Sequence, residues 1–171
     1  GGIAPVLDDA ELARRMAEIG TRPSWFAAQV ERSEVGEVIR AHKRALRRAH
    51  RLVLALSLSD PSLQDSVLAQ FEAAGLSAIA LDRDAVISEA DQAVIVPRIK
   101  DDGDRDGLWH RIAPVSFMGR SLGPFGGIDP YPAAAMGSAI LHGCHVSDFT
   151  TAYARLATGK AARAVQDGYE L

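Results

Sequence analysis

The sequence predicts an α/β domain, in which a parallel β-sheet is covered by helices on both faces. Short apolar runs, expected to be strands, alternate along the chain with longer segments of helical composition. The strand runs are apolar throughout rather than at alternate positions, which is typical of parallel strands buried on both faces. The alternation indicates a Rossmann-like sheet of about five to six strands with right-handed crossovers. A chain of 171 residues is long enough for one such domain with a full core.

In the first half of the chain, residues suited to helix ends set the limits of each element. Asp8 begins a first helix, which Gly20 ends, and Ser33 is a suitable N-cap for a long second helix. Pro61 follows Asp60 at the start of a third helix, where proline is well tolerated. The expected elements are a helix over 10–19, a strand over 25–29, a helix over 33–50, a strand over 52–58, a helix over 61–74, and strands over 76–81 and 93–96.

The second half of the chain continues this alternation after a polar loop over 100–106 that holds four aspartates. The loop lacks the late glutamate of a calcium-binding loop, so we interpret it as a solvated acidic loop. Asp129 is suited to cap a short helix that begins at Pro130 and stops near Gly137, and Asp148 is suited to cap another. The expected elements are a helix over 107–112, a strand over 115–118, the short helix, a strand over 139–142, a helix over 149–157 and a last strand over 162–165.

Composition excludes some classes of function. The net charge of -3 gives no overall basic field, so no nucleic-acid partner is expected. The single cysteine, Cys144, rules out an internal disulfide, fits a reducing compartment and is interpreted as a small buried residue. No apolar run approaches the ~18 residues of a membrane span, and no signal-peptide pattern opens the chain. We therefore expect a soluble domain.

One basic cluster lies in the expected long helix. Its side chains share the outer face of that helix, while Val38, Ile39 and Leu46 share the inner face. We favour a solvated helix face as the interpretation, with contact to anionic lipid as the alternative. The cluster consists of Arg40, Lys43, Arg44, Arg47, Arg48 and Arg51.

The stretch that says most about function begins at Gly119. The expected strand over 115–118 runs into a loop with four glycines, and the helix start at Pro130 follows. A strand, a glycine loop and a helix N-terminus in that order form a suitable anion site, because free backbone N–H groups and the positive end of the helix dipole meet there. Glycine loops also form tight turns without any ligand, so the pattern alone leaves both interpretations open.

The same stretch resembles the C-terminal half of the 3-deoxy-D-manno-octulosonic acid (Kdo) transferases, bacterial lipopolysaccharide enzymes of the GT-B architecture. That family typically has Gly-Gly-Ser-Leu, then Gly-Gly-His-Asn-Pro-Leu-Glu-Pro-Ala, and later Gly-Pro-His before Asn-Phe. The matching positions here are Gly119, Arg120, Ser121 and Leu122, then 126–133, then Gly143, Cys144, His145, Asp148 and Phe149. The similarity extends over most of the chain and is clearest after Trp109.

The resemblance implies a fold, an activity and partners. Residues 1–171 would be a single nucleotide-sugar-binding domain, the C-terminal half of a GT-B fold, excised from a two-domain protein. The family transfers Kdo from CMP-Kdo to a lipid A precursor at the cytoplasmic face of the bacterial inner membrane, where the full-length enzyme associates peripherally. It uses no metal and no cofactor besides the donor substrate. Because the acceptor site and the carboxylate base belong to the preceding domain, we expect no catalytic residue here and no activity from the isolated chain.

Residue by residue, the resemblance implies six positions that contact the donor. They are Glu34, Ser121, Gly126, Gly127, Asp129 and His145. Glu34 is what remains of a Ser-Thr-His-x-Gly-Glu loop after the first strand. The stretch over 58–63 replaces a Pro-Arg-His-Pro-Glu-Arg motif and has lost both arginines, the residues best suited to a phosphate. Two hypotheses therefore stand: a divergent transferase with a changed donor, or a catalytically degenerate module that serves protein or lipid interaction.

Asp129 stands where the family has asparagine, so it places a carboxylate at the helix start. We expect this carboxylate to occupy the N–H groups of Gly126, Gly127 and the first helical turn. It would then compete with a phosphate for the same donors, and repulsion between the two anions would oppose binding further.

The histidines divide into two pairs. His42 and His50 lie on the basic helix and are expected at the surface. His142 and His145 lie at the carboxyl end of a strand, which is where α/β proteins bind ligands. His145 matches the histidine of the Gly-Pro-His motif and is therefore the one expected to line the cleft.

Overall fold

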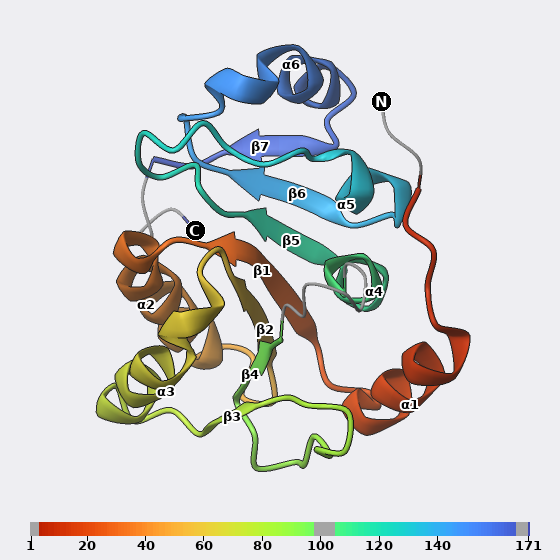
Figure 1. The fold of residues 1–171 in the computed structure, drawn as a ribbon, viewed down its shortest axis with the longest axis vertical. Helices are drawn as coiled ribbons and strands as arrows, with labels where there is room; N and C mark the ends of the chain where they lie inside the picture. The colour runs from red at the N-terminus through yellow and green to blue at the C-terminus, as the bar shows by residue number, and fades with distance from the viewer. Residues whose placement is uncertain (1–3, 98–104, 167–170) are drawn as a thin grey trace.

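The computed structural model describes residues 4–97, 105–166 and 171, and it confirms the predicted fold class (Figure 1). One all-parallel sheet has the strand order β3-β4-β2-β1-β5-β6-β7. It has seven strands where about five to six were estimated, and the expected short last segment is the seventh. The strands are β1 (Ser24–Val30), β2 (Val53–Leu58), β3 (Ala78–Ala80), β4 (Ala93–Val96), β5 (Val115–Met118), β6 (Ala139–His142) and β7 (Ala162–Ala164).

Helices cover both faces of the sheet, as predicted (Figure 1). α2 (Val35–Leu46) and α3 (Gln64–Ala73) pack on one face, and α1 (Asp9–Ile19), α4 (Asp106–Ile112), α5 (Tyr131–Ala135) and α6 (Thr150–Thr158) pack on the other. In β2, Leu54 and Leu56 join the first core, while Val53 and Ala55 join the second. The apolar runs of β2 and β4 follow from this, because these central strands are buried on both sides.

The predicted helix over 33–50 is shorter in the structure. A turn of 3-10 helix, Arg32–Glu34, comes first, and α2 then runs from Val35 to Leu46. Ser33 lies exposed within the turn and does not cap the helix. Instead, the Glu34 side chain accepts the N–H of Glu31 at 2.9 Å. The sequence prediction placed the helix start correctly to within two residues and assigned the cap to the wrong side chain.

His42 is fully buried, which corrects the expectation that it lies at the surface. It faces β1 from α2, and its Nδ1 accepts the indole N–H of Trp25 at 3.0 Å. Its Nε2 therefore carries the hydrogen and donates to the carbonyl oxygen of Gln92 at 2.8 Å. Burial lowers the pKa of His42 to about 4, so the ring is neutral at physiological pH.

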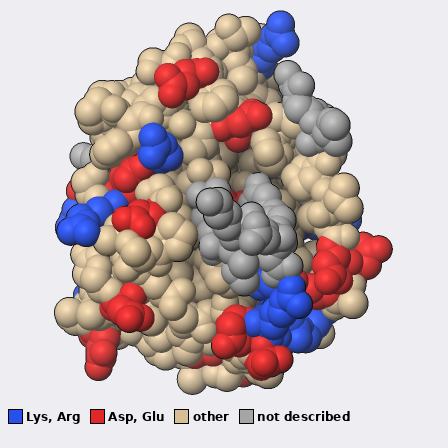
Figure 2. Space-filling model, viewed as in Figure 1, with Lys and Arg blue, Asp and Glu red and all other residues tan. Residues whose placement is uncertain are grey.

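The basic cluster lies on α2 and the turn that follows it, with Lys43, Arg47 and Arg48 exposed. Arg40 forms an ion pair with Glu37 one turn earlier, and Arg51 pairs with Glu89 at 3.3 Å. The predicted outer helix face is thus confirmed for α2. On the face of the molecule drawn in Figure 2, basic and acidic side chains of the described residues are interspersed.

Two further expectations concern membranes and the acidic loop. Among the described residues, no helix is both long and apolar enough to cross a membrane. Most of the predicted acidic loop lies outside the described residues. Its last aspartate, Asp106, begins α4, where it is buried and accepts a hydrogen bond from the Ser57 hydroxyl at 3.1 Å.

Candidate ligand crevice

The strand order places a topological switch point between β1 and β5. β1 pairs with β2 along one of its edges and with β5 along the other (Figure 1). The strands that directly follow β1 in the chain therefore lie to one side of it, and those from β5 onward lie to the other. In open α/β sheets, ligands bind outside the carboxyl ends of the strands at such a point. Two loops meet there: residues 31–34 after β1 and residues 119–122 after β5.

The Glu34 carboxylate joins these two loops. Its Oε1 accepts the backbone N–H groups of Glu31 at 2.9 Å and Arg120 at 2.7 Å. Its Oε2 accepts the N–H groups of Ser121 at 3.1 Å and Leu122 at 3.0 Å. Three successive N–H groups after β5 thus form an anion-binding nest. The nest is filled by a side chain of the protein itself, which is only 1% exposed.

The approach of the two loops depends on Gly119. A Cβ at this position would overlap the carbonyl oxygens of Ala28 and Gln29, so only glycine fits. The Gly119 N–H donates to the Ala28 carbonyl oxygen at 2.7 Å, which extends the pairing of β1 and β5 by one bond. Gln29 and Arg120 flank this contact with positive φ angles of 51° and 58°, which are uncommon for residues with side chains.

Ser121 links the crevice to the loop after β6. Its hydroxyl donates to the Met118 carbonyl oxygen at 2.5 Å and accepts the Gly143 N–H at 2.8 Å. Its own carbonyl oxygen accepts the His145 N–H at 3.0 Å. Ser121 is fully buried, so the structure gives its side chain a role in holding the loops after β5 and β6 together.

The glycine pair closes the loop after β5 on itself. Gly126 and Gly127 have φ angles of 91° and 85°, which favour glycine. The Gly127 N–H donates to the Arg120 carbonyl oxygen at 2.8 Å. A Cβ on Gly126 would overlap the carboxylate of Asp148, so this turn also packs against the loop after β6.

The expectation that Asp129 binds the N–H of Gly127 is wrong, because Arg120 already accepts that hydrogen. The Asp129 Oδ1 accepts the N–H of Tyr131 at 2.9 Å, at the start of α5. This part of the expectation, a carboxylate at the helix start, holds. The internal carboxylate that fills the N–H groups of this loop is therefore Glu34 and not Asp129.

Sequence reasoning missed Arg120 as a functional candidate. Its guanidinium forms an ion pair with Glu31, and its Nη2 donates to the Phe125 carbonyl oxygen at 3.1 Å. The guanidinium carbon also lies 5.8 Å from the centre of the Phe125 ring, within range of a cation–π contact. The Arg120 side chain is 36% exposed. The signal in the sequence was an arginine where the matched motif has a glycine.

The two histidines at the carboxyl end of β6, His142 in the strand and His145 in the loop after it, differ in exposure. His142 is buried, its Nδ1 lies 2.6 Å from the Gly143 carbonyl oxygen, and burial lowers its pKa. It packs on Tyr153, whose hydroxyl donates to the Ile128 carbonyl oxygen at 2.7 Å. His145 is exposed beside the crevice loops. Cys144 is exposed as well, which corrects its interpretation as a buried residue.

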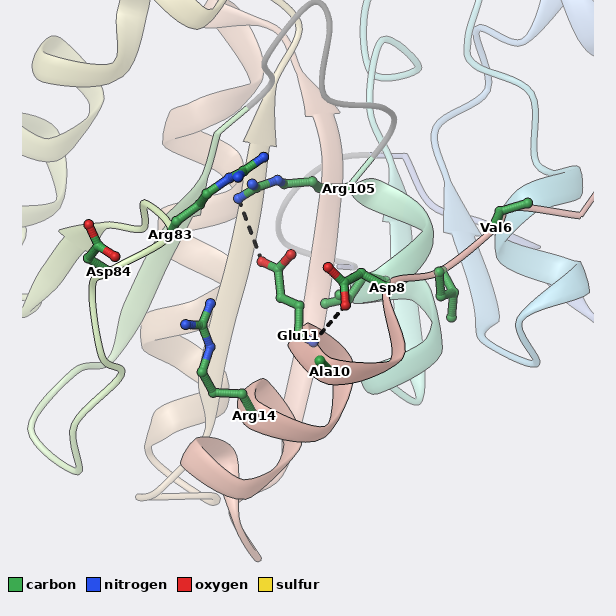
Figure 3. A pocket seen from close by; sticks show the side chains of 10 residues that line it. Val6, Asp8, Ala10, Glu11, Arg14, Arg83, Asp84 and Arg105 are labelled. Atoms are coloured by element: carbon green, nitrogen blue, oxygen red, sulfur yellow. Dashed lines mark hydrogen bonds and ion pairs between the residues drawn. The ribbon is translucent and has the colours of Figure 1, made fainter.

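A separate cavity of about 480 Å³ lies among α1, the loop after β3 and the start of α4 (Figure 3). Arg105 forms an ion pair with Glu11 there at 3.6 Å. Arg14 and Arg83 also line the cavity, and Asp8 and Asp84 balance them. None of the residues that the resemblance assigned to the donor lines this cavity. The charged residues that line it are three arginines and three carboxylates, so their formal charges sum to zero.

Two solved structures share this fold, although no protein-family model matches the chain. The C-terminal CMP-Kdo binding domain of WaaA from Acinetobacter baumannii superposes with a TM-score of 0.84 at 18% identity, over 93% of this chain and 82% of that one. The chain has the fold of that domain. E. coli ADP-heptose LPS heptosyltransferase II superposes with a TM-score of 0.52 at 13% identity, over 94% of this chain and 44% of that protein. The predicted fold, the C-terminal half of a GT-B architecture, agrees with both.

The structure brings five of the six predicted donor-contacting residues into or beside the loops of the crevice: Glu34, Ser121, Gly126, Gly127 and His145. Asp129 lies further along, at the start of α5. Their contacts with a donor remain predictions. Glu34 and Ser121 are buried and hold backbone groups, so their geometry supports a role in shaping the crevice. Among the five residues at these loops, His145 is the exposed one, and Asp129 at the start of α5 is exposed as well.

Proposed function

We propose that this chain is the nucleotide-sugar-binding domain of a glycosyltransferase of lipopolysaccharide biosynthesis, with CMP-Kdo as the donor. The observation that carries the proposal is the likeness in fold to a CMP-Kdo binding domain over 93% of the chain. The likeness to a heptosyltransferase that uses an ADP-linked sugar supports the broader class. The crevice at the switch point, flanked by glycine loops, is where such a ligand would bind.

In this proposal the chain binds and orients the donor. Glu34 fixes the loop after β5, and Ser121 fixes that loop against the one after β6. Both contacts are internal, so these loops are held in place before any ligand arrives. No residue of this chain is assigned to the chemical step, and no metal or cofactor is needed. A preceding domain would supply the carboxylate base and bind the lipid A precursor, and the full-length protein would associate peripherally with the cytoplasmic face of the inner membrane.

Calorimetric titration with nucleotides tests the proposal. We expect CMP to bind the chain at low salt, and to bind more tightly than ADP, the nucleotide of the heptosyltransferase donor. Tighter binding of ADP would support the broader class, a glycosyltransferase of lipopolysaccharide biosynthesis, with an ADP-linked sugar as the donor in place of CMP-Kdo. Absence of binding by both nucleotides up to millimolar concentration, about −4 kcal/mol, would contradict the proposal.

One observation favours a second candidate, a degenerate module that has lost donor binding. The N–H nest after β5 is filled by Glu34, and the segment after β2, residues 58–63, carries no arginine or lysine. A module of this kind would keep the fold and bind another protein or a lipid. It predicts no stabilisation of the chain by CMP in thermal unfolding, whereas a bound donor fragment would raise the unfolding temperature.

A further inference from the structure

We infer that Arg120 recognises the anionic group of the nucleotide sugar, and that Glu31 occupies Arg120 until that group displaces it. This inference rests on the proposed function. It adds an anion subsite, made of one cation and one competing carboxylate, at the mouth of the crevice. The ligand chemistry is the phosphate of the nucleotide.

The position of Arg120 is fixed by the fold. It is the second residue after β5, at the switch point, and Glu34 accepts its backbone N–H at 2.7 Å. Its φ of 58° is a left-handed conformation that a glycine would adopt more readily. The loop therefore accepts a strained arginine at a position where a guanidinium projects beside the carboxyl ends of β1 and β5.

The side chain of Arg120 is held in place rather than free in solvent. Glu31 and the Phe125 carbonyl oxygen each take one side of the guanidinium, and the Phe125 ring lies near it. A guanidinium has five N–H donors, so these two partners leave donors for a third. With 36% of the side chain exposed, compared with 19% for Glu31, a ligand can reach Arg120 from the solvent.

The other anion-binding features of the crevice are already used or missing. Glu34 fills the N–H nest, and the Gly127 N–H is taken by the Arg120 carbonyl oxygen. The segment after β2 has no arginine or lysine. In the two loops that meet at the switch point, 31–34 and 119–122, the only cations are Arg32 and Arg120. Of these two, Arg120 is the one that contacts the glycine loop, through the carbonyl oxygen and the ring of Phe125, so we assign the phosphate to it.

In the absence of a ligand, the Glu31 carboxylate occupies the subsite through its ion pair with Arg120. The phosphate of a nucleotide sugar offers a guanidinium two oxygens at once, and free CMP carries a second negative charge as well. It can therefore replace Glu31, but it must also approach that carboxylate, which weakens binding. Removing the Glu31 charge should consequently tighten phosphate binding, and removing the Arg120 charge should weaken it.

Three variants of the full chain test this inference by calorimetry with CMP and with cytidine, which lacks the phosphate. Arg120→Gly removes the cation and suits the positive φ, so the fold should be kept, which urea unfolding checks. Glu31→Gln removes the competing charge and keeps an acceptor. Arg32→Gln, an exposed cation in the neighbouring loop, is the matched control. We expect Arg120→Gly to weaken CMP binding by at least about tenfold, as loss of a charged hydrogen-bond partner does, and to leave cytidine binding unchanged.

The remaining outcomes are equally informative. Tighter binding of CMP by Glu31→Gln than by the parent supports the inference. Equal CMP affinity of the parent and Arg120→Gly overturns it while the proposed function stands, and so does an equal loss in Arg32→Gln. If neither the parent nor Glu31→Gln binds CMP or cytidine, both this inference and the proposed function fail.

Discussion

Substitution of Glu34 by glutamine should destabilise the protein far more than the loss of one surface charge. Each carboxylate oxygen of Glu34 accepts two backbone N–H groups. A glutamine supplies one oxygen and one NH₂ group, so two of the four buried donors would face another donor. A buried donor without its acceptor costs about 1–3 kcal/mol. Some relaxation of the loop toward water is expected, which gives a loss of about 2–4 kcal/mol in the free energy of unfolding.

Urea unfolding at pH 7 measures this loss, with an unchanged slope as evidence that both proteins unfold in the same way. Glu37→Gln is the matched control, because Glu37 lies one turn further along and pairs with the exposed Arg40. An exposed helical pair of this kind is worth about 0.3–0.5 kcal/mol. If Glu34→Gln cost no more than the control, the carboxylate would not be what holds the loops after β1 and β5 together.

Two other features of the structure should also affect the stability of the fold. Gly119→Ala should destabilise the chain by about 2 kcal/mol or more, since its Cβ would overlap two carbonyl oxygens. Gly137→Ala, at a φ of 83° but in open space, serves as the control and should cost about 1 kcal/mol. Acid should also weaken the fold through His42 and His110, because burial lowers the pKa of each to about 4. In the unfolded chain both rings bind protons below pH ~6.5, whereas in the folded protein they do so only near pH ~4. The free energy of unfolding is therefore unaffected by protonation of these rings above pH ~6.5. Between pH ~6.5 and ~4 it falls by about 1.4 kcal/mol per pH unit for each ring. Proton NMR of the two rings should show no titration between pH 7.5 and 5, and a midpoint near 6.5 for either ring would contradict its burial.

Local patterns in the sequence were enough to predict most of the fold. The apolar runs predicted β2 and β4 because burial on both faces makes most positions of a central strand apolar. Asp8 and Gly20 predicted the ends of α1, because capping depends on residues only a few positions apart. The limits of α2 were less accurate, since its first turn is set by Glu34, whose other partners lie in the loop after β5.

The candidate site was predicted only in part, for the same physical reason. The glycine loop could be found from its spacing, and its likeness to a known family was confirmed at the level of the fold. The side chain that fills the N–H nest of this loop could not be predicted, because Glu34 and Ser121 lie 87 positions apart in the sequence. His42 was expected at the surface for a similar reason, since the basic residues around it concealed that its ring faces Trp25.

The contact between Glu34 and the nest also bears on the order in which the chain assembles. β1 and β2 are close in sequence, with α2 between them, so they can pair early. β5 comes much later in the chain, so a long loop must close before β5 reaches β1. The carboxylate cannot gain three of its four partners until that closure has happened. The amide hydrogens of residues 120–122 are therefore a natural reporter in exchange experiments, because their protection measures how firmly the two halves of the sheet are docked.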